Sequence, residues 1–148
     1  MAKLIGYDFI DTDILIQGQE NAKLNEIIDS KGIDRFLEIE SDTCSALHVV
    51  HSIVATGGSV VYRDNAMQHL RALGKIVYLR VDIQDLKDRL SDMKQRGVVL
   101  KKGQTVEELF KERTVLYEKY ADITVDESGL NLEQTVEQIR IQLDFING

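Results

Sequence analysis

The sequence predicts an α/β fold in which a parallel sheet lies between two layers of helices. Three observations support this prediction. Short apolar segments alternate with amphipathic helical segments along the whole chain. The predicted strands are apolar through their length, as is typical of strands buried on both faces. Unusual residues follow two of these strands, at the edge where ligands bind in such sheets: Asp11, Asp13 and Gly57-Gly58.

Composition narrows the class of protein. A length of 148 residues predicts one domain, 1–148, and no apolar run approaches the roughly 18 residues of a membrane span. The net charge of −7 argues against a protein that binds nucleic acid or anionic membranes in general, although a few converging arginines can still hold a small anion. The single cysteine, Cys44, fits a reducing compartment, so we expect a cytoplasmic protein.

Two strands and two helices are predicted in the first half. Tyr7–Ile10 is short, apolar and aromatic, and is therefore read as a strand. Apolar residues at helical spacing indicate a helix over Leu24–Ser30 and a second over Ile33–Leu47, separated by Gly32. Ser52–Thr56 is rich in β-branched residues and runs into a double glycine, which predicts a buried strand that enters a tight turn.

The middle of the chain repeats this alternation. Asp64 is expected to cap a helix that runs through Leu73 and ends at a glycine. The clearest strand follows at Lys75–Val81. Asp82 then caps a helix that ends at about Gln95.

A polar stretch, 96–104, contains two glycines and two lysines and is read as a mobile loop. Thr105 and Glu108 form a capping box at the start of the next helix. Ile123–Val125 is the last predicted strand, and Asn131 with Gln134 begins a final amphipathic helix.

Five motifs stand in a characteristic order. They are Phe9-Ile10-Asp11-Thr12-Asp13, Gly32…Phe36…Glu40, Ala55-Thr56-Gly57-Gly58-Ser59, Arg96, and Glu112-Arg113-Thr114-Val115-Leu116-Tyr117. Over nearly all 148 residues their order and spacing resemble those of shikimate kinases. The resemblance implies the fold of that family, ATP and Mg²⁺ as cofactors, and phosphoryl transfer to a hydroxyl of shikimate or a related small hydroxy acid. It also implies a place in aromatic amino acid biosynthesis and a lid at 96–104.

The resemblance also implies roles for six residues. Asp13 would bind and deprotonate the acceptor hydroxyl, Asp11 would hold Mg²⁺ through water, the backbone of Gly57 and Gly58 would approach the acceptor, Arg113 would bind its carboxylate, and Arg96 would close over the ATP phosphates. From the residues alone, structural alternatives remain open. Either aspartate can cap a helix, a Gly-Gly pair can be a simple turn, and an arginine can pack its stem while its head stays solvated. Since acids at i and i+2 of one strand face the same side, we expect the two aspartates to act together.

Departures from the family pattern bear on the acceptor. Leu37 stands where the family has a carboxylate-binding arginine, and Arg35 lies on a different face of the helix. Ser59 replaces the third glycine of the turn, and Val115 replaces a proline. The Leu37 departure favours a small hydroxy acid other than shikimate.

The sequence has no Gly-rich phosphate loop ending in Gly-Lys-Ser/Thr, and only Met1–Ile5 precede the segment Gly6–Asp13 that contains the first motif. In the family, the strand before that loop lies at the centre of the sheet. We expect the sheet to close by direct pairing, to take a strand from another chain by self-association, or to belong to a longer protein. The chain as given is expected to be a poor kinase. The alternative is a non-catalytic binding or regulatory protein derived from a kinase.

Overall fold

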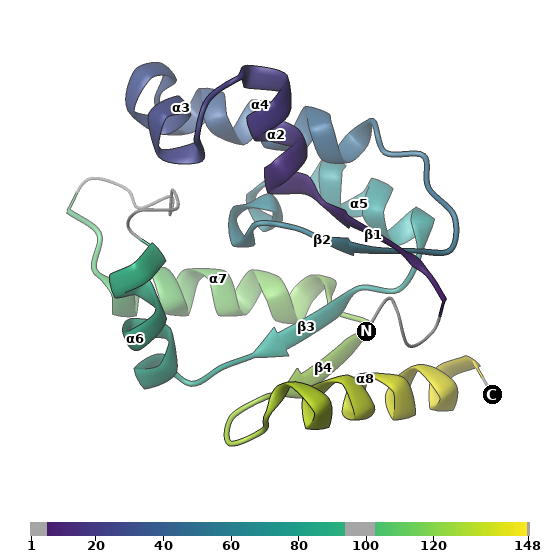
Figure 1. Cartoon of the computed structure of the whole chain (residues 1–148). Coiled ribbons are helices and arrows are strands. Elements are labelled where there is room, and N and C mark those ends of the chain that lie inside the picture. The colour runs from purple at the N-terminus through teal and green to yellow at the C-terminus, as the bar shows by residue number, and fades with distance from the viewer. Residues whose placement is uncertain (1–5, 94–102, 148) are drawn as a thin grey trace.

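The computed structural model describes residues 6–93 and 103–147 (Figure 1). Strands and helices alternate in the order β1 (Asp8–Asp11), α2 (Thr12–Glu20), α3 (Leu24–Lys31), α4 (Ile33–Ser45), β2 (Ser52–Ala55), the 3₁₀ helix η1 (Gly58–Tyr62), α5 (Asp64–Leu73), β3 (Val77–Arg80), α6 (Ile83–Met93), α7 (Val106–Tyr120), β4 (Ile123–Asp126) and α8 (Leu132–Asn147). The predicted alternation is confirmed. In the two described stretches, no helix has the length and apolar character needed to cross a bilayer.

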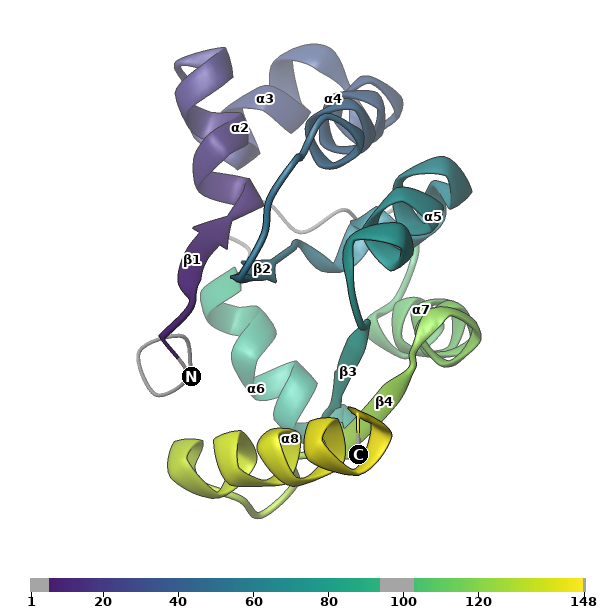
Figure 2. The same ribbon diagram turned by 90° about the vertical axis from the view of Figure 1, so that its right-hand side faces the viewer.

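The strands form two separate parallel pairs rather than one continuous sheet. β1 pairs with β2, with Asp8 opposite Ser52. β3 pairs with β4, with Val77 opposite Ile123. Within residues 6–93 and 103–147, no ladder joins β2 to β3 (Figures 1 and 2). Direct pairing, one of the three expected ways to close the sheet, is therefore not formed in this part of the chain.

α2 is a helix that the sequence analysis did not predict. It begins directly after β1 because Asp11 caps it: its Oδ1 accepts hydrogen bonds from the backbone N–H groups of Asp13 (2.9 Å) and Ile14 (3.3 Å). Strand β1 ends at Asp11, so Asp13 is helical. The expectation that both aspartates project from one side of a strand is wrong.

Other helix starts follow their sequence signals, with one exception. The Thr105–Glu108 capping box is confirmed at α7, and Asn131 and Gln134 exchange hydrogen bonds at the start of α8. Asp64, by contrast, does not cap α5. It is the first helical residue, and its carboxylate accepts a hydrogen bond from the Tyr120 hydroxyl at 2.6 Å. The capping prediction is wrong because this carboxylate is used to join α5 to α7.

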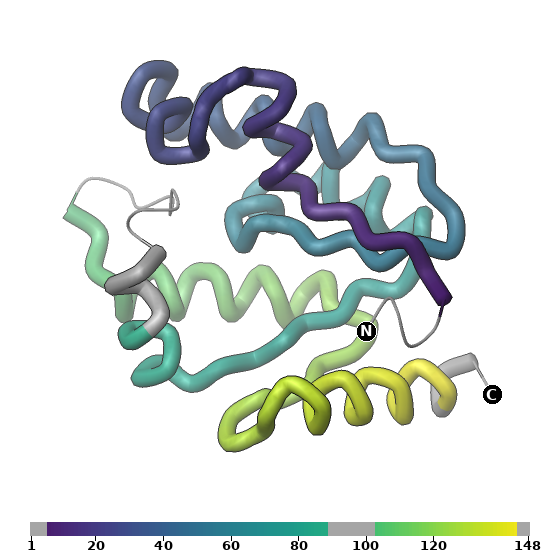
Figure 3. Tube along the Cα trace, in the orientation of Figure 1, coloured from purple at the N-terminus to yellow at the C-terminus, as the bar shows by residue number. Residues whose placement is uncertain are grey.

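Three apolar clusters hold the helices around the strands. One joins α2, α3 and α4, and a second joins α4, η1, α5 and α7. The third joins β3 and β4 to α8, with Val77 at its edge. The next residue, Tyr78, stacks on Tyr117 of α7 with 5.0 Å between ring centroids. Because successive strand residues face opposite sides, α7 and α8 cover opposite faces of the β3–β4 pair. The Cα trace shows that α4 and α7, which both reach the glycine turn after β2, lie on opposite sides of that turn (Figure 3).

Candidate functional site

The glycine pair after β2 lies between side chains of opposite charge. A Cβ atom added to Gly57 would stand 3.0 Å from Glu40 Oε2 and 3.1 Å from Asp13 Oδ1. A Cβ atom added to Gly58 would stand 2.8 Å from a terminal guanidinium nitrogen of Arg113. Gly57 has an ordinary extended backbone, with φ −67° and ψ 155°. Glycine is therefore needed here for space, and it brings bare backbone next to two acids and a cation.

The acidic side of the site consists of two carboxyl groups from two helices, the half-buried Asp13 and the buried Glu40. Asp13, in the first turn of α2, has an Oδ1 atom that is buried and accepts no hydrogen bond from any described residue. Burial raises the pKa of Asp13, and the nearby charge of Asp11 raises it further. An unpaired buried acceptor of this kind is ready to take a hydrogen bond from a ligand hydroxyl.

Glu40 of α4 is only 1% exposed, and the Ser59 hydroxyl lies 2.7 and 2.9 Å from its two carboxylate oxygens. Burial raises the pKa of Glu40 to about 7, with a smaller contribution in the same direction from Asp13. The Ser59 hydrogen bond and the Arg113 charge act in the opposite direction. Glu40 therefore exchanges a proton near neutral pH, next to a second carboxyl group.

The basic side comes from α7 and the end of η1. The Arg113 guanidinium lies over the Tyr62 ring, 5.6 Å from its centroid, and Nε donates to the Tyr62 hydroxyl at 3.4 Å. The Tyr117 hydroxyl donates to the Gly58 carbonyl at 3.0 Å. These contacts fix Arg113 beside the glycine turn, where it can bind an anionic group.

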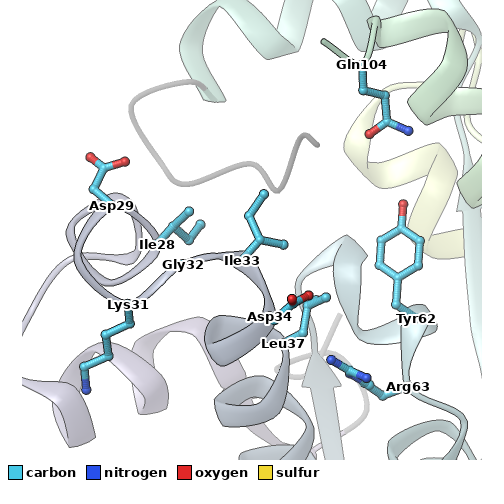
Figure 4. Close-up of a pocket in the computed structure, with 10 residues that line it drawn as sticks. All are labelled: Ile28, Asp29, Lys31, Gly32, Ile33, Asp34, Leu37, Tyr62, Arg63 and Gln104. Carbon is cyan, nitrogen blue, oxygen red and sulfur yellow. The ribbon is translucent and has the colours of Figure 1, made fainter. Parts of the chain in front are cut away.

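An open pocket of about 930 Å³ adjoins this site (Figure 4). Its wall contains Ile28, Asp29, Lys31, Gly32, Ile33, Asp34, Leu37, Tyr62, Arg63 and Gln104. It meets the glycine site at two points. Leu37 lies one helical turn before Glu40 on α4, and Tyr62 contacts Arg113. Asp13 does not line the pocket.

The structure brings together four of the predicted site residues: Asp13, Gly57, Gly58 and Arg113. The side chain of Asp11 is directed to the start of α2, as the helix-capping alternative requires. Arg96, predicted to act on the phosphates, lies outside the described residues, as does most of the predicted lid at 96–104.

Sequence reasoning did not propose Glu40 or Ser59 as site residues. A signal for Glu40 was present, because this acid stands in the apolar stripe of its helix together with Phe36 and Cys44. A charged residue in such a stripe is buried and needs a partner. Nothing in the sequence alone indicated that Ser59 would be that partner.

The fit to the implied cofactors differs between Mg²⁺ and ATP. Among the described residues, no group of three His, Cys, Asp or Glu side chains could hold a metal ion. Asp11 uses Oδ1 for capping, which leaves Oδ2 for a water of a Mg²⁺ ion that completes its shell with water and phosphate oxygens. Asp11 therefore fits a secondary role toward Mg²⁺. The described residues include no Gly-rich loop with a lysine, so they do not by themselves form an ATP phosphate site.

Comparisons with known proteins agree on one family. A family model described as shikimate kinase matches residues 1–144. The shikimate kinase of Thermodesulfovibrio yellowstonii is 33% identical over 142 residues, which cover 94% of this chain and 82% of that protein. The shikimate kinase of Haemophilus influenzae is 32% identical over 152 residues, which cover 100% of this chain and 84% of that protein.

Solved structures share the fold. Shikimate kinase from Acinetobacter baumannii in complex with shikimate superposes with a TM-score of 0.81 at 24% identity, covering 99% of this chain and 83% of that one. Shikimate kinase from Aquifex aeolicus gives a TM-score of 0.80 at 24% identity, covering 97% and 84%. The predicted α/β fold of this family, with parallel strands and covering helices, is therefore confirmed.

Proposed function

The chain belongs to the shikimate kinase family, and we propose that its glycine-turn site binds the acceptor of a phosphoryl transfer from ATP. The acceptor is shikimate or a related small hydroxy acid. One observation carries this proposal: the bare backbone of Gly57 and Gly58 has carboxyl groups on one side and a guanidinium on the other. A hydroxy acid offers a donor to the first and a carboxylate to the second.

Asp13 is the proposed proton acceptor. Its buried, unpaired Oδ1 takes a hydrogen bond from the acceptor hydroxyl, and its raised pKa suits a group that must accept a proton. Arg113 binds the acceptor carboxylate from the other side of the turn, and Asp11 assists the hydration shell of Mg²⁺. Arg96 is proposed to act on the transferred phosphoryl group and on ATP, by resemblance to the family.

The identity of the acceptor depends on Leu37. This residue is 8% exposed and gives the pocket an apolar wall where the family has an arginine. A panel of shikimate and other small hydroxy acids, tested for binding by calorimetry, separates the two possibilities. We expect at least one of these acids to bind without ATP. Failure of every acid in the panel to bind would overturn the proposed function.

We propose that these 148 residues alone do not turn over ATP, because the sequence contains no Gly-x-x-x-x-Gly-Lys-Ser/Thr motif to cradle the phosphates. A coupled assay with ATP, Mg²⁺ and shikimate tests this directly, and robust metal-dependent turnover would refute it. With a segment that carries this phosphate-binding motif, the protein would be a kinase of aromatic amino acid biosynthesis. Its proposed location is the cytoplasm, where a single unpaired cysteine stays reduced.

The absence of this motif from the 148 residues also favours a second candidate function: a non-catalytic protein that binds a small hydroxy acid. Sequencing the DNA upstream of the Met1 codon separates the two functions. An in-frame strand and phosphate loop within about 25 codons favours the kinase, and a stop codon there favours the binding protein.

Self-association is proposed as one way to complete the sheet. The edges of β2 and β3 form no ladder with each other in the described residues, and such edges readily pair with added strands. Sedimentation velocity at two protein concentrations tests this proposal. We expect a dimer that dissociates on dilution, and a monomer at both concentrations would exclude self-association.

A further inference from the structure

We propose that Arg63 is a carboxylate-binding residue of the acceptor pocket. From the junction of η1 and α5 it supplies the positive charge that the family arginine, replaced here by Leu37, would supply from α4. This inference rests on the proposed function and names a specificity residue for the same site. No motif of the sequence analysis includes Arg63.

The backbone around Arg63 fixes the direction of its side chain. Arg63 joins η1 to α5 in an extended conformation, with φ −118° and ψ 106°. Its N–H donates to the Val60 carbonyl at 3.1 Å, and its own carbonyl accepts from the N–H of Met67 at 3.2 Å. From this position the guanidinium reaches into the pocket toward Leu37 (Figure 4).

One donor of the Arg63 guanidinium has no hydrogen-bond acceptor in the part of the chain that the structure describes. Its Nε is buried and donates to no described residue. Other arginines do pair with carboxylates: Arg35 with Glu38, Arg80 with Asp126, and Arg140 with Glu137. A buried donor without a partner is costly, and a planar two-oxygen anion is the ligand whose shape matches a guanidinium. A carboxylate entering the pocket would satisfy this donor.

The surroundings favour Arg63 over the other charged residues of the wall. Lys31 is the second cation of the pocket, but its Nζ contacts Glu20 at 2.6 Å. Asp34 and Asp29 also line the pocket, and no ion pair joins either acid to Arg63 in the described parts of the chain. The apolar side chain of Leu37 strengthens the attraction between Arg63 and an anion by excluding water.

Arg63 can act together with Arg113. Tyr62, the residue before Arg63, also lines the pocket and receives the Nε–H of Arg113. Arg113 of α7 therefore contacts the residue next to Arg63, so the two guanidinium groups approach the acceptor region from two different elements. A hydroxy acid whose hydroxyl lies near Asp13 would present its carboxylate to this pair.

The test is calorimetric binding of shikimate and of shikimate methyl ester, which lacks the negative charge, to the 148-residue chain. The variants are Arg63→Gln and Arg63→Lys, with Arg71→Gln on the exposed face of α5 as the matched control. Circular dichroism confirms that each variant is folded. We expect Arg63→Gln to weaken shikimate binding about 10- to 100-fold, Arg63→Lys to weaken it less, and Arg71→Gln to leave it unchanged. The ester should bind wild type weakly and be insensitive to Arg63→Gln.

Two results would overturn the inference while the proposed function stands. One is shikimate binding by Arg63→Gln equal to that of wild type. The other is an equal loss of affinity for shikimate and its ester in Arg63→Gln, which would mean that Arg63 does not bind the carboxylate. If the wild-type chain binds neither compound, nor any acid of the panel, the proposed function itself fails, and the inference fails with it.

Discussion

The Ser59 hydroxyl lies 2.7 and 2.9 Å from the two carboxylate oxygens of Glu40, and these side chains are buried, with 4% and 1% of their surface exposed. Ser59 occupies the position of the third family glycine, and Glu40 lies one turn after the leucine that replaces the family arginine. The serine hydroxyl thus partners a buried carboxylate that has no arginine beside it at position 37. The Ser59 hydroxyl and, to a smaller extent, the charge of Arg113 lower the pKa of this buried acid.

Replacing Glu40 with Gln should change the pH dependence of stability. The folded-state pKa of Glu40 is about 7, above its usual value of 4.5, so folding favours the protonated form. Its contribution is fully present below pH 4.5 and is lost as pH rises to about 7. The Glu40→Gln variant does not suffer this loss. Between pH 4.5 and 8 it should gain up to about 3 kcal/mol relative to wild type, measured by urea unfolding.

Glu38→Gln is the matched control, because Glu38 lies on the same helix in an exposed ion pair with Arg35. Its stability difference from wild type should stay small at both pH values. A Glu40→Gln difference that does not change with pH would show that this carboxyl group titrates normally.

Ser59→Ala should destabilise the protein by about 1–3 kcal/mol, because it leaves a buried carboxyl group without its hydroxyl partner. It should also raise the pKa of Glu40 further, since the Ser59 hydrogen bond lowers that pKa. Urea unfolding and NMR titration of the glutamate carboxyl carbon measure the two effects. The control is Ser30→Ala, whose hydroxyl is exposed and bonds a carbonyl of its own helix. Equal losses of unfolding free energy in the two variants would show that the Ser59–Glu40 hydrogen bond contributes no more than an exposed one.

Gly58→Ala should weaken acceptor binding by at least about tenfold and lower stability. The new Cβ would stand 2.5 Å from the Tyr117 hydroxyl and 2.8 Å from Arg113, so both side-chain ends must move away from the turn. Gly18→Ala is the control, because nothing lies within 4 Å of its added Cβ in α2. Removing a helical glycine should stabilise that variant by about 0.5–1 kcal/mol without altering binding. Calorimetry measures the affinity of both variants for the hydroxy acid. Unchanged affinity in Gly58→Ala would argue against a ligand at this turn.

Phe36→Ala should cost about 3–5 kcal/mol of unfolding free energy, because Phe36 is 2% exposed in the cluster that joins α2, α3 and α4. Val115→Ala, at a side chain 67% exposed on α7, should cost well under 1 kcal/mol. Denaturant midpoints give both values. A small loss at Phe36 would mean that this cluster does not anchor α4.

Helix starts and strands were predictable where local chemistry decides them. The capping box at Thr105, the exchange between Asn131 and Gln134, and the β-branched run at Ser52–Thr56 each indicate their element from a few neighbouring residues. α2 was not predicted because only Thr12 and Ile16 of its nine residues are buried, which leaves almost no apolar stripe to recognise.

What the sequence did not reveal depends on contacts between distant segments. Asp64 looks like a cap, but the hydroxyl of Tyr120, 56 residues away, takes its carboxylate. Likewise, Arg63 and Leu37 line one pocket only once η1 folds next to α4. The split of the strands into two pairs depends equally on how backbone edges meet, which no local pattern encodes.

Cys44 is fully buried on the same helix as Glu40, and burial raises its pKa to about 12. A thiol in this state does not react with alkylating reagents while the helix stays packed. Because the chain has one cysteine, the rate at which it is alkylated measures how often the core beneath the glycine turn opens transiently. A ligand bound at that turn should lower the alkylation rate of Cys44. Mass spectrometry of the alkylated protein can therefore report ligand binding at the glycine turn without any enzymatic turnover.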